Sequence, residues 1–274
     1  MGERKEAGRE YPSVIDLAYK EYKRYLKVQE IMTRDVVTIA TEAPMDEAAR
    51  TMGEKRIGSL IALKYETPVG IVTERDLLSK VLAKGLNLKE ARVENVMSYP
   101  LIKICPTTQI REAAQTMIKK KGRLAVFECG DLVGIITASD LIRRLPEAPE
   151  TAIKIDDFMT RKVTTADEKT TVANIARTMG EKRIGSVIIT SKGEPMGIFT
   201  ERDLLTSFLA KDRTLNVEVG EVASSPLVTA PLGTSVLEAG RIMASKRVRR
   251  LPISKDGELV GIVTARDLVE AYAK

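Results

Sequence analysis

One nine-residue stretch occurs four times in the chain and decides its architecture. The copies read GIVTERDLL (70–78), GIITASDLI (134–142), GIFTERDLL (197–205) and GIVTARDLV (261–269). Their starting positions are almost evenly spaced along the chain. Self-similarity at a fixed period is typical of a repeated structural unit. The sequence therefore predicts four units, which together span nearly the whole chain of 274 residues.

A second, longer repeat contains two copies of the short one. The segment ARTMGEKRIGS at 49–59 recurs unchanged at 176–186. The segment that begins at Gly130 matches the one that begins at Gly257, at the same offset along the chain. The first unit therefore resembles the third and the second resembles the fourth, so a pair of units was duplicated.

Within each unit the residue pattern predicts the order β-α-β-β-α, an α/β fold that some schemes class as α+β. Two strands joined through a helix normally lie parallel, and two strands joined by a tight turn form a hairpin. The first strand is expected at segments such as 36–39 and 226–230, and the hairpin turn at Gly130–Asp131 and Asp256–Gly257. The last strand is expected to begin at the repeat glycine. A column of methionines on the first helix is assigned to the core: Met52, Met117, Met179 and Met243.

A three-stranded sheet with two helices, about 60 residues, is marginal alone, so each unit should pair with another. We expect two paired modules, which either close into a disc within one chain or complete discs between two chains. An amphipathic helix is predicted at 14–27, and a proline-rich boundary between the halves at 145–152. The predicted divisions are a tail and helix at 1–27 and units at 28–84, 85–148, 149–211 and 212–274.

Composition argues against most enzyme classes. Histidine is absent, which excludes Ser-His and Cys-His nucleophiles and histidine zinc sites. Cys105 and Cys129 have no metal-ligand spacing, and neither a Walker loop nor GxGxxG occurs. We expect no catalysis, no metal and no catalytic cofactor. No apolar stretch is long enough for a membrane span and no secretory signal is visible, so a cytoplasmic protein without membrane contact is expected.

The net positive charge of the chain is compatible with an anionic binding partner. The chain has 44 basic and 38 acidic residues, a net charge of +6 and a pI near 9.2. The runs at 119–123 and 245–250 are cationic, which keeps nucleic acid as an alternative partner. Tryptophan is absent and aromatic residues make up 4%, which argues against base-stacking surfaces. Abundant Glu, Lys and Arg also fit the mixed-charge surface of a heat-adapted protein.

The repeated stretch contains a threonine and an aspartate three residues apart, where a strand ends and a helix begins. This spacing is that of a helix capping box, which needs no ligand. The same place is also suited to an anion, and a carboxylate there can accept hydrogen bonds from the two hydroxyls of a ribose. The four pairs are Thr73 and Asp76, Thr137 and Asp140, Thr200 and Asp203, and Thr264 and Asp267. Glu74 and Glu201, next to the threonines, have no second carboxylate at catalytic spacing and are assigned to the surface.

Four units that end in this motif resemble CBS domains (cystathionine-β-synthase-type domains), whose tandem pairs are called Bateman modules. The resemblance covers about residues 28–272. It implies that adenosine nucleotides are held with the aspartate on the ribose and the threonine toward phosphate or ribose. It also implies that a basic residue at the start of the second strand of a unit faces the phosphates, here Arg123 and Arg250. Independently of the resemblance, a guanidinium just before a motif aspartate can bind a phosphate or can be an exposed residue of the first helical turn. These candidates are Arg75, Arg202 and Arg266.

The resemblance further implies that the base lies against strand residues of the first, third and fourth units. These are Thr38, Ile39, Ile57, Gly58, Thr164, Thr165, Ile184, Gly185, Val228 and Thr229.

The function expected from these observations is sensing. Binding of AMP, ADP or ATP in clefts between units would be signalled to a regulated protein partner, with adenine nucleotide as the regulatory ligand. Three alternatives stay open: an S-adenosylmethionine or dinucleotide sensor, a nucleic-acid-binding protein that uses its basic runs, and a scaffold with empty clefts. A second copy of the chain is a further candidate partner.

Overall fold

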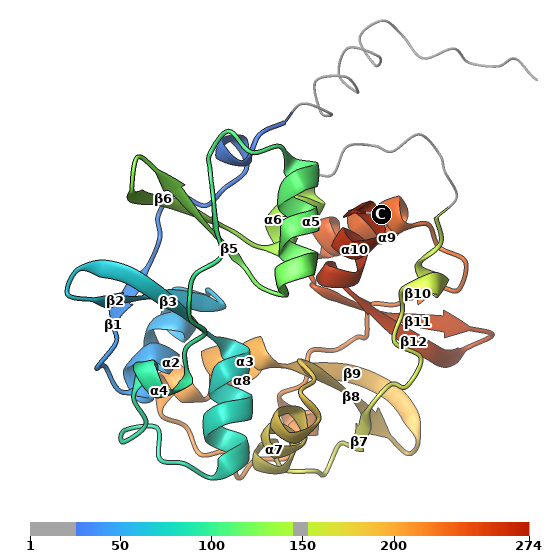
Figure 1. The fold of residues 1–274 in the computed structure, drawn as a ribbon. Coiled ribbons are helices and arrows are strands. Elements are labelled where there is room, and N and C mark those ends of the chain that lie inside the picture. The colour runs from blue at the N-terminus through green and yellow to red at the C-terminus, as the bar shows by residue number, and fades with distance from the viewer. Residues whose placement is uncertain (1–25, 145–152, 274) are drawn as a thin grey trace, which may run out of the picture.

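The computed structural model of the chain describes residues 26–144 and 153–273. The boundary predicted at 145–152 and nearly all of the helix predicted at 14–27 lie outside these residues. Within the described part, four three-stranded sheets surround a common centre (Figure 1). The predicted order β-α-β-β-α and the α/β class are confirmed.

The four units have matching elements. The first contains β1 (Thr38–Ala40), α2 (Met45–Glu54), β2 (Ser59–Lys64), β3 (Thr67–Thr73), α3 (Glu74–Asp76), η2 (Leu77–Val81) and η3 (Leu82–Lys84), preceded by η1 (Val28–Glu30). The second contains α4 (Val93–Val96), β4 (Lys103–Ile104), α5 (Ile110–Lys120), β5 (Leu124–Glu128), β6 (Asp131–Ile136) and α6 (Ala138–Arg144). The third contains η4 (Ile155–Asp157), β7 (Thr165–Asp167), α7 (Val172–Lys182), β8 (Ser186–Ser191), β9 (Glu194–Thr200), α8 (Glu201–Ser207) and η5 (Leu209–Lys211). The fourth contains η6 (Val219–Glu221), β10 (Ala230–Pro231), α9 (Val236–Lys246), β11 (Arg250–Lys255), β12 (Glu258–Thr264) and α10 (Ala265–Ala273).

In every unit the first strand pairs in parallel with the second, and the second pairs antiparallel with the third. The hairpin turns have two residues with positive φ, as at Asp256–Gly257, which matches the twist of the flanking strands. The turn predicted at Gly130–Asp131 is wrong by one position, because Cys129 and Gly130 form it and Asp131 starts β6. The first unit turns at Tyr65–Glu66, where no glycine marks the position.

The repeat glycines lie inside the third strands and do not start them, so that prediction is wrong. Their role is to make room for a crossing chain. The segment that leads into the first unit crosses β6 of the second unit, where Thr33 pairs with Ile135. A Cβ on Gly134 would lie 2.6 Å from the Met32 sulfur, so only glycine fits beneath it. Gly261 and Met159 repeat this arrangement in the other half.

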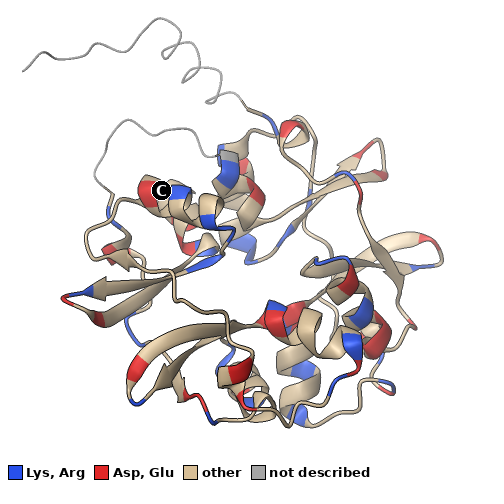
Figure 2. Ribbon diagram, turned by 180° about the vertical axis from the view of Figure 1, so that it is seen from behind, with Lys and Arg blue, Asp and Glu red and all other residues tan. Residues whose placement is uncertain are grey.

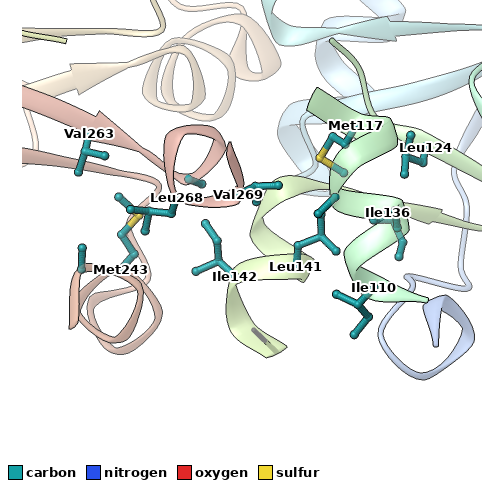
Figure 3. Packing of buried hydrophobic residues seen from close by; sticks show 14 of the residues in the cluster. Ile110, Met117, Leu124, Ile136, Leu141, Ile142, Met243, Val263, Leu268 and Val269 are labelled. Carbon is teal, nitrogen blue, oxygen red and sulfur yellow. The ribbon is translucent and has the colours of Figure 1, made fainter. Parts of the chain in front are cut away.

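The two halves close on each other within one chain, through helices. Helix α2 packs against α8 and η5, and α7 packs against η2 and η3, so the first unit faces the third. Helix α10 packs against α5 and α6, so the fourth unit faces the second (Figure 1). Figure 3 shows Leu141 and Ile142 of α6 beside Leu268 and Val269 of α10, within one continuous core. The methionine column lies in the core, as predicted.

Within the first half the two units meet through their sheets. Ile61 of the first unit packs with Ala125 and Ile135 of the second in a separate small cluster. Each sheet thereby buries apolar side chains against its neighbour, as expected for units too small to fold alone.

The helix contact between the first and third units depends on two glycines. A Cβ on Gly180 would lie 2.6 Å from the Leu78 carbonyl oxygen, and one on Gly53 would lie 2.9 Å from that of Leu205. We expect Gly180→Ala to lower the free energy of unfolding by about 1–3 kcal/mol, because a main-chain oxygen cannot move away easily. Urea denaturation followed by circular dichroism measures the change.

Gly240→Ala is the matched control on α9, since its Cβ would meet Ile142 at an ordinary 3.5 Å. At Gly240 the gain in helix propensity, up to about 1 kcal/mol, should outweigh any steric cost, so the substitution should stabilise the fold. Equal destabilisation by both substitutions would contradict the close helix contact.

Candidate functional site

Each of the four threonine–aspartate pairs lies where the third strand ends and a helix begins. The aspartate Oδ2 accepts two hydrogen bonds from its threonine. The main-chain N–H donates at 2.7–3.0 Å and the hydroxyl at 2.6–2.8 Å. In the first and third units the aspartate N–H also donates to the threonine hydroxyl, which completes the predicted capping box.

This geometry assigns different roles to the two residues of the pair. In this structure the threonine hydroxyl donates to the aspartate. The second carboxylate oxygen, Oδ1, is left for another donor. Burial raises the pKa of Asp203, which the bonds from Thr200 offset in part, and the pKa of Asp267 is shifted in the same way. A partly desolvated carboxylate with one unused oxygen is suited to the hydroxyl groups of a sugar.

The centre of the molecule holds two carboxylates that were assigned to the surface, and that prediction is wrong. Glu74 and Glu201 are 5% and 6% exposed. Each follows a motif threonine, and each lies beside a glycine that precedes the second strand of its own unit. A Cβ on Gly58 would lie 2.8 Å from Glu74 Oε2, and one on Gly185 would lie 2.7 Å from Glu201 Oε2. The glycines therefore make the room in which the carboxylates lie.

Arginines surround these carboxylates, and three of the four ion pairs that join them within the described residues cross between the two halves. Arg75 Nε lies 3.3 Å from Glu201, and Arg202 Nε lies 3.7 Å from Glu74. Arg250, from the fourth unit, donates to Glu201 at 2.7 Å. Figure 2 shows basic and acidic segments side by side where the units meet.

The environment of Glu74 is looser than that of Glu201. Arg249 lies 4.0 Å from Glu74, and a Cβ on Gly58 would also meet the Arg123 guanidinium at 3.1 Å. Burial lowers the pKa of Arg123, with Glu74 and Glu201 acting in the opposite direction. Burial and repulsion from Arg202 lower the pKa of Arg249 to about 10. Burial and neighbouring arginines therefore both disfavour the charged form of Arg249, although its side chain is still 39% exposed.

Donors and acceptors at this place are incompletely matched. Within the described residues, the buried Nε and Nη2 of Arg202 and the Oε1 of Glu74 have no hydrogen-bond partner. The Nε and the Oε1 lie 3.7 Å apart, too far for a hydrogen bond between them. A pocket of about 470 Å³ lies next to this place, where the second and fourth units face each other. It is lined by Arg143, Arg202, Arg247 and Arg249 and by no carboxylate. Buried donors beside a cationic pocket are suited to an anion with several oxygens.

The structure brings four of the five predicted arginines together at the centre: Arg75, Arg123, Arg202 and Arg250. Arg266 instead acts on its neighbour Asp267.

The strand residues expected to line the base fall into three groups. The side chain of Ile39 is buried in the core of the first unit, so only its main chain could meet a ligand, while Ile57, Ile184 and Val228 pack partly against the core. Gly58 and Gly185 lie beside the central ions. The remaining candidates are exposed or half-exposed: Thr38, Thr164, Thr165 and Thr229.

Sequence reasoning missed three central residues: Glu74, Glu201 and Arg249. A signal was present, because the motif reads TERD in the odd units and TASD or TARD in the even ones. The even units instead carry an arginine, Arg123 or Arg250, where the odd units have serine at the start of a strand. The alternation of glutamate and arginine indicates pairing between units.

Loss of one central carboxylate should destabilise the fold. We expect Glu201→Ala to cost about 3–5 kcal/mol, because Arg250 would remain buried without its partner. Arg75→Gln should cost about 1 kcal/mol or less, since the Arg75 side chain is 56% exposed. Urea denaturation measures both, and added phosphate should restore part of the loss in Glu201→Ala. Similar small effects of the two substitutions would argue against a buried ion cluster.

The raised pKa of Asp203 predicts the direction in which the stability of the fold changes with pH. The folded state holds the proton more tightly than the unfolded state, so this group's contribution to stability falls as pH rises from 3.8 through the folded-state pKa. Asp203→Asn removes that dependence. Relative to the parent chain, the variant should gain stability as pH rises from about 3.5 to 6, measured by thermal unfolding. If the difference in stability between the variant and the parent stayed constant over this pH range, the raised pKa of Asp203 would be contradicted.

Comparison with known proteins identifies the family to which the chain belongs. The model of the CBS domain matches residues 28–83, 93–147, 155–210 and 219–274. The uncharacterized protein MJ1404 of Methanocaldococcus jannaschii is 29% identical over 266 residues, which cover 90% of this chain and 62% of that protein. The chain therefore spans less than two thirds of the length of MJ1404. MJ1225 of the same organism is 30% identical over 196 residues, 66% of this chain and 69% of that protein.

Two solved structures share the fold. The crystal structure of MJ1225, described as a proposed archaeal homologue of g-AMPK, has a TM-score of 0.74 at 22% identity, with 90% of this chain and 100% of that chain covered. A conserved uncharacterized protein from Pyrococcus horikoshii has a TM-score of 0.63, also at 22% identity, with the same coverage. Among the described residues, no helix is long and apolar enough to cross a membrane. Four matched units, four matching sheets and this agreement in fold show that the chain belongs to the CBS domain family, whose members are generally regulatory rather than catalytic.

Proposed function

We propose that the protein is a regulatory sensor of adenosine nucleotides, with AMP, ADP and ATP as the leading ligands. The observation that carries this proposal is the excess of arginine at the centre. Five guanidinium groups, from Arg75, Arg123, Arg202, Arg249 and Arg250, lie around the carboxylates of Glu74 and Glu201. Asp76 and Asp203 also act on members of this group, and the arginines still outnumber the carboxylates. An anion at the centre would supply the missing acceptors.

The motif aspartates provide the second part of the proposed site. Asp203 and Asp267 each keep Oδ1 free of donors from the described residues, while Oδ2 is held by the threonine. A ligand with a sugar diol at one end and phosphates at the other fits this pair of features. S-adenosylmethionine has the diol but no phosphate, so it would leave the arginines unmatched.

A signal would arise because the arginines connect the two halves. Arg75 and Arg202 each reach from one half to the carboxylate of the other. A phosphate that attracts Arg75 or Arg202 away from its glutamate would weaken one ion pair between the halves. It would strengthen another contact between them. Binding then shifts the populations of two arrangements, to the extent that the ligand prefers one of them. A protein partner would detect the altered arrangement.

Titration calorimetry with AMP, ATP and S-adenosylmethionine tests the proposal. We expect the two nucleotides to bind at micromolar concentration and S-adenosylmethionine to bind more weakly. Asp203→Asn and Asp267→Asn should each weaken nucleotide binding by about tenfold or more, through loss of a charged acceptor. Asp131→Asn, exposed at the start of β6, is the control that should leave binding unchanged.

Absence of binding by all three ligands in the folded chain would refute the proposal. A gel shift with RNA or DNA that weakens steeply with salt, in a chain that binds no nucleotide, would favour the nucleic-acid alternative instead.

A further inference from the structure

The first and third units are identical over the motif TERD, yet their aspartates differ in environment. Thr73, Glu74, Arg75 and Asp76 are repeated at 200–203. Asp76 is buried at 7% exposure, whereas its counterparts are only partly buried: Asp140, Asp203 and Asp267. A difference between duplicated copies points to the residues around them.

One residue near the motif that differs between the two copies is Lys80, one helical turn after Asp76, where the third unit has Ser207. Its ammonium lies 2.7 Å from Asp76 Oδ1, the oxygen that Thr73 leaves unused. The same ammonium donates to the carbonyl oxygen of Val96, at the end of α4. Lys80 is therefore held from two sides, and Asp76 has both of its oxygens occupied.

The third unit has Ser207 at the position of Lys80, four positions after Asp203. No cation of the described residues contacts Asp203 Oδ1 there, and the fourth unit has Ala271 at the same position. A ligand hydroxyl can reach an unpaired, partly exposed carboxylate oxygen. To reach that of Asp76, it would have to displace a lysine that is anchored twice.

We propose that Lys80 closes the site of the first unit, so that the sugar diol of the ligand is bound by Asp203 in the third unit and not by Asp76 in the first. This inference rests on the proposed nucleotide binding and goes beyond it, because it assigns unequal roles to two copies of one motif. Lys80 is a specificity-determining residue that works by occupying the acceptor that the ligand needs.

Reciprocal exchange of the two residues tests the inference in the full-length chain. Calorimetry with AMP counts the sites in the parent, Lys80→Ser and Ser207→Lys. We expect Lys80→Ser to add one site and Ser207→Lys to remove one or weaken it about tenfold or more. Lys80→Met, which keeps the aliphatic stem, is the second variant should the serine chain unfold, and thermal unfolding checks each protein.

Asparagine substitutions then assign the sites. Asp203→Asn should weaken AMP binding in the parent, Asp76→Asn should not, and Asp76→Asn should abolish the site that Lys80→Ser adds. Weaker binding in the parent on Asp76→Asn, or an unchanged site count in both folded Lys80 variants, would overturn the role of Lys80 and leave nucleotide sensing intact. Absence of AMP and ATP binding by the parent and all variants would refute nucleotide sensing itself, and this inference with it.

Discussion

The two buried glutamates, Glu74 and Glu201, are the charges on which the arrangement of the four units depends. Five arginines, drawn from all four units, meet at this centre. Guanidinium groups that lose water and lie close together disfavour their own charge, and the lowered pKa of Arg249 reflects both effects. The carboxylates reduce the repulsion and connect one half to the other through crossed pairs. They do not cancel it for Arg249, whose pKa stays lowered although Glu74 acts against the shift.

The threonine–aspartate pairs combine a structural and a chemical role. One carboxylate oxygen accepts two bonds from the threonine at the junction of strand and helix, and this alone justifies the motif in all four units. The other oxygen is not needed for the cap. Local stability and ligand recognition can therefore use the same residue without conflict, and neighbouring residues decide whether the second oxygen is available.

Duplication followed by divergence explains how near-identical sequences take different roles. The odd units carry glutamate after the motif threonine, and the even units carry arginine at the start of the second strand. Glycine appears where another segment passes closely, as at Gly134 beneath Met32 and at Gly180 against Leu78. The units are thus specialised for their neighbours, which is why four copies form one closed assembly with defined contacts.

The sequence by itself determined the repeat, the order of the elements, the hairpins and the capping pairs, because these depend on residues close together in the chain. It also predicted that arginines would face a common place, through the family resemblance. Its errors were of another kind: Glu74 and Glu201 were assigned to the surface, and Arg249 and Lys80 were not singled out. Their roles come from groups far away along the chain, as in the pair of Glu74 with Arg249, or from a main-chain oxygen of the next unit. Burial, ion pairing and the availability of one oxygen depend on which units face each other, and only the tertiary structure decides that.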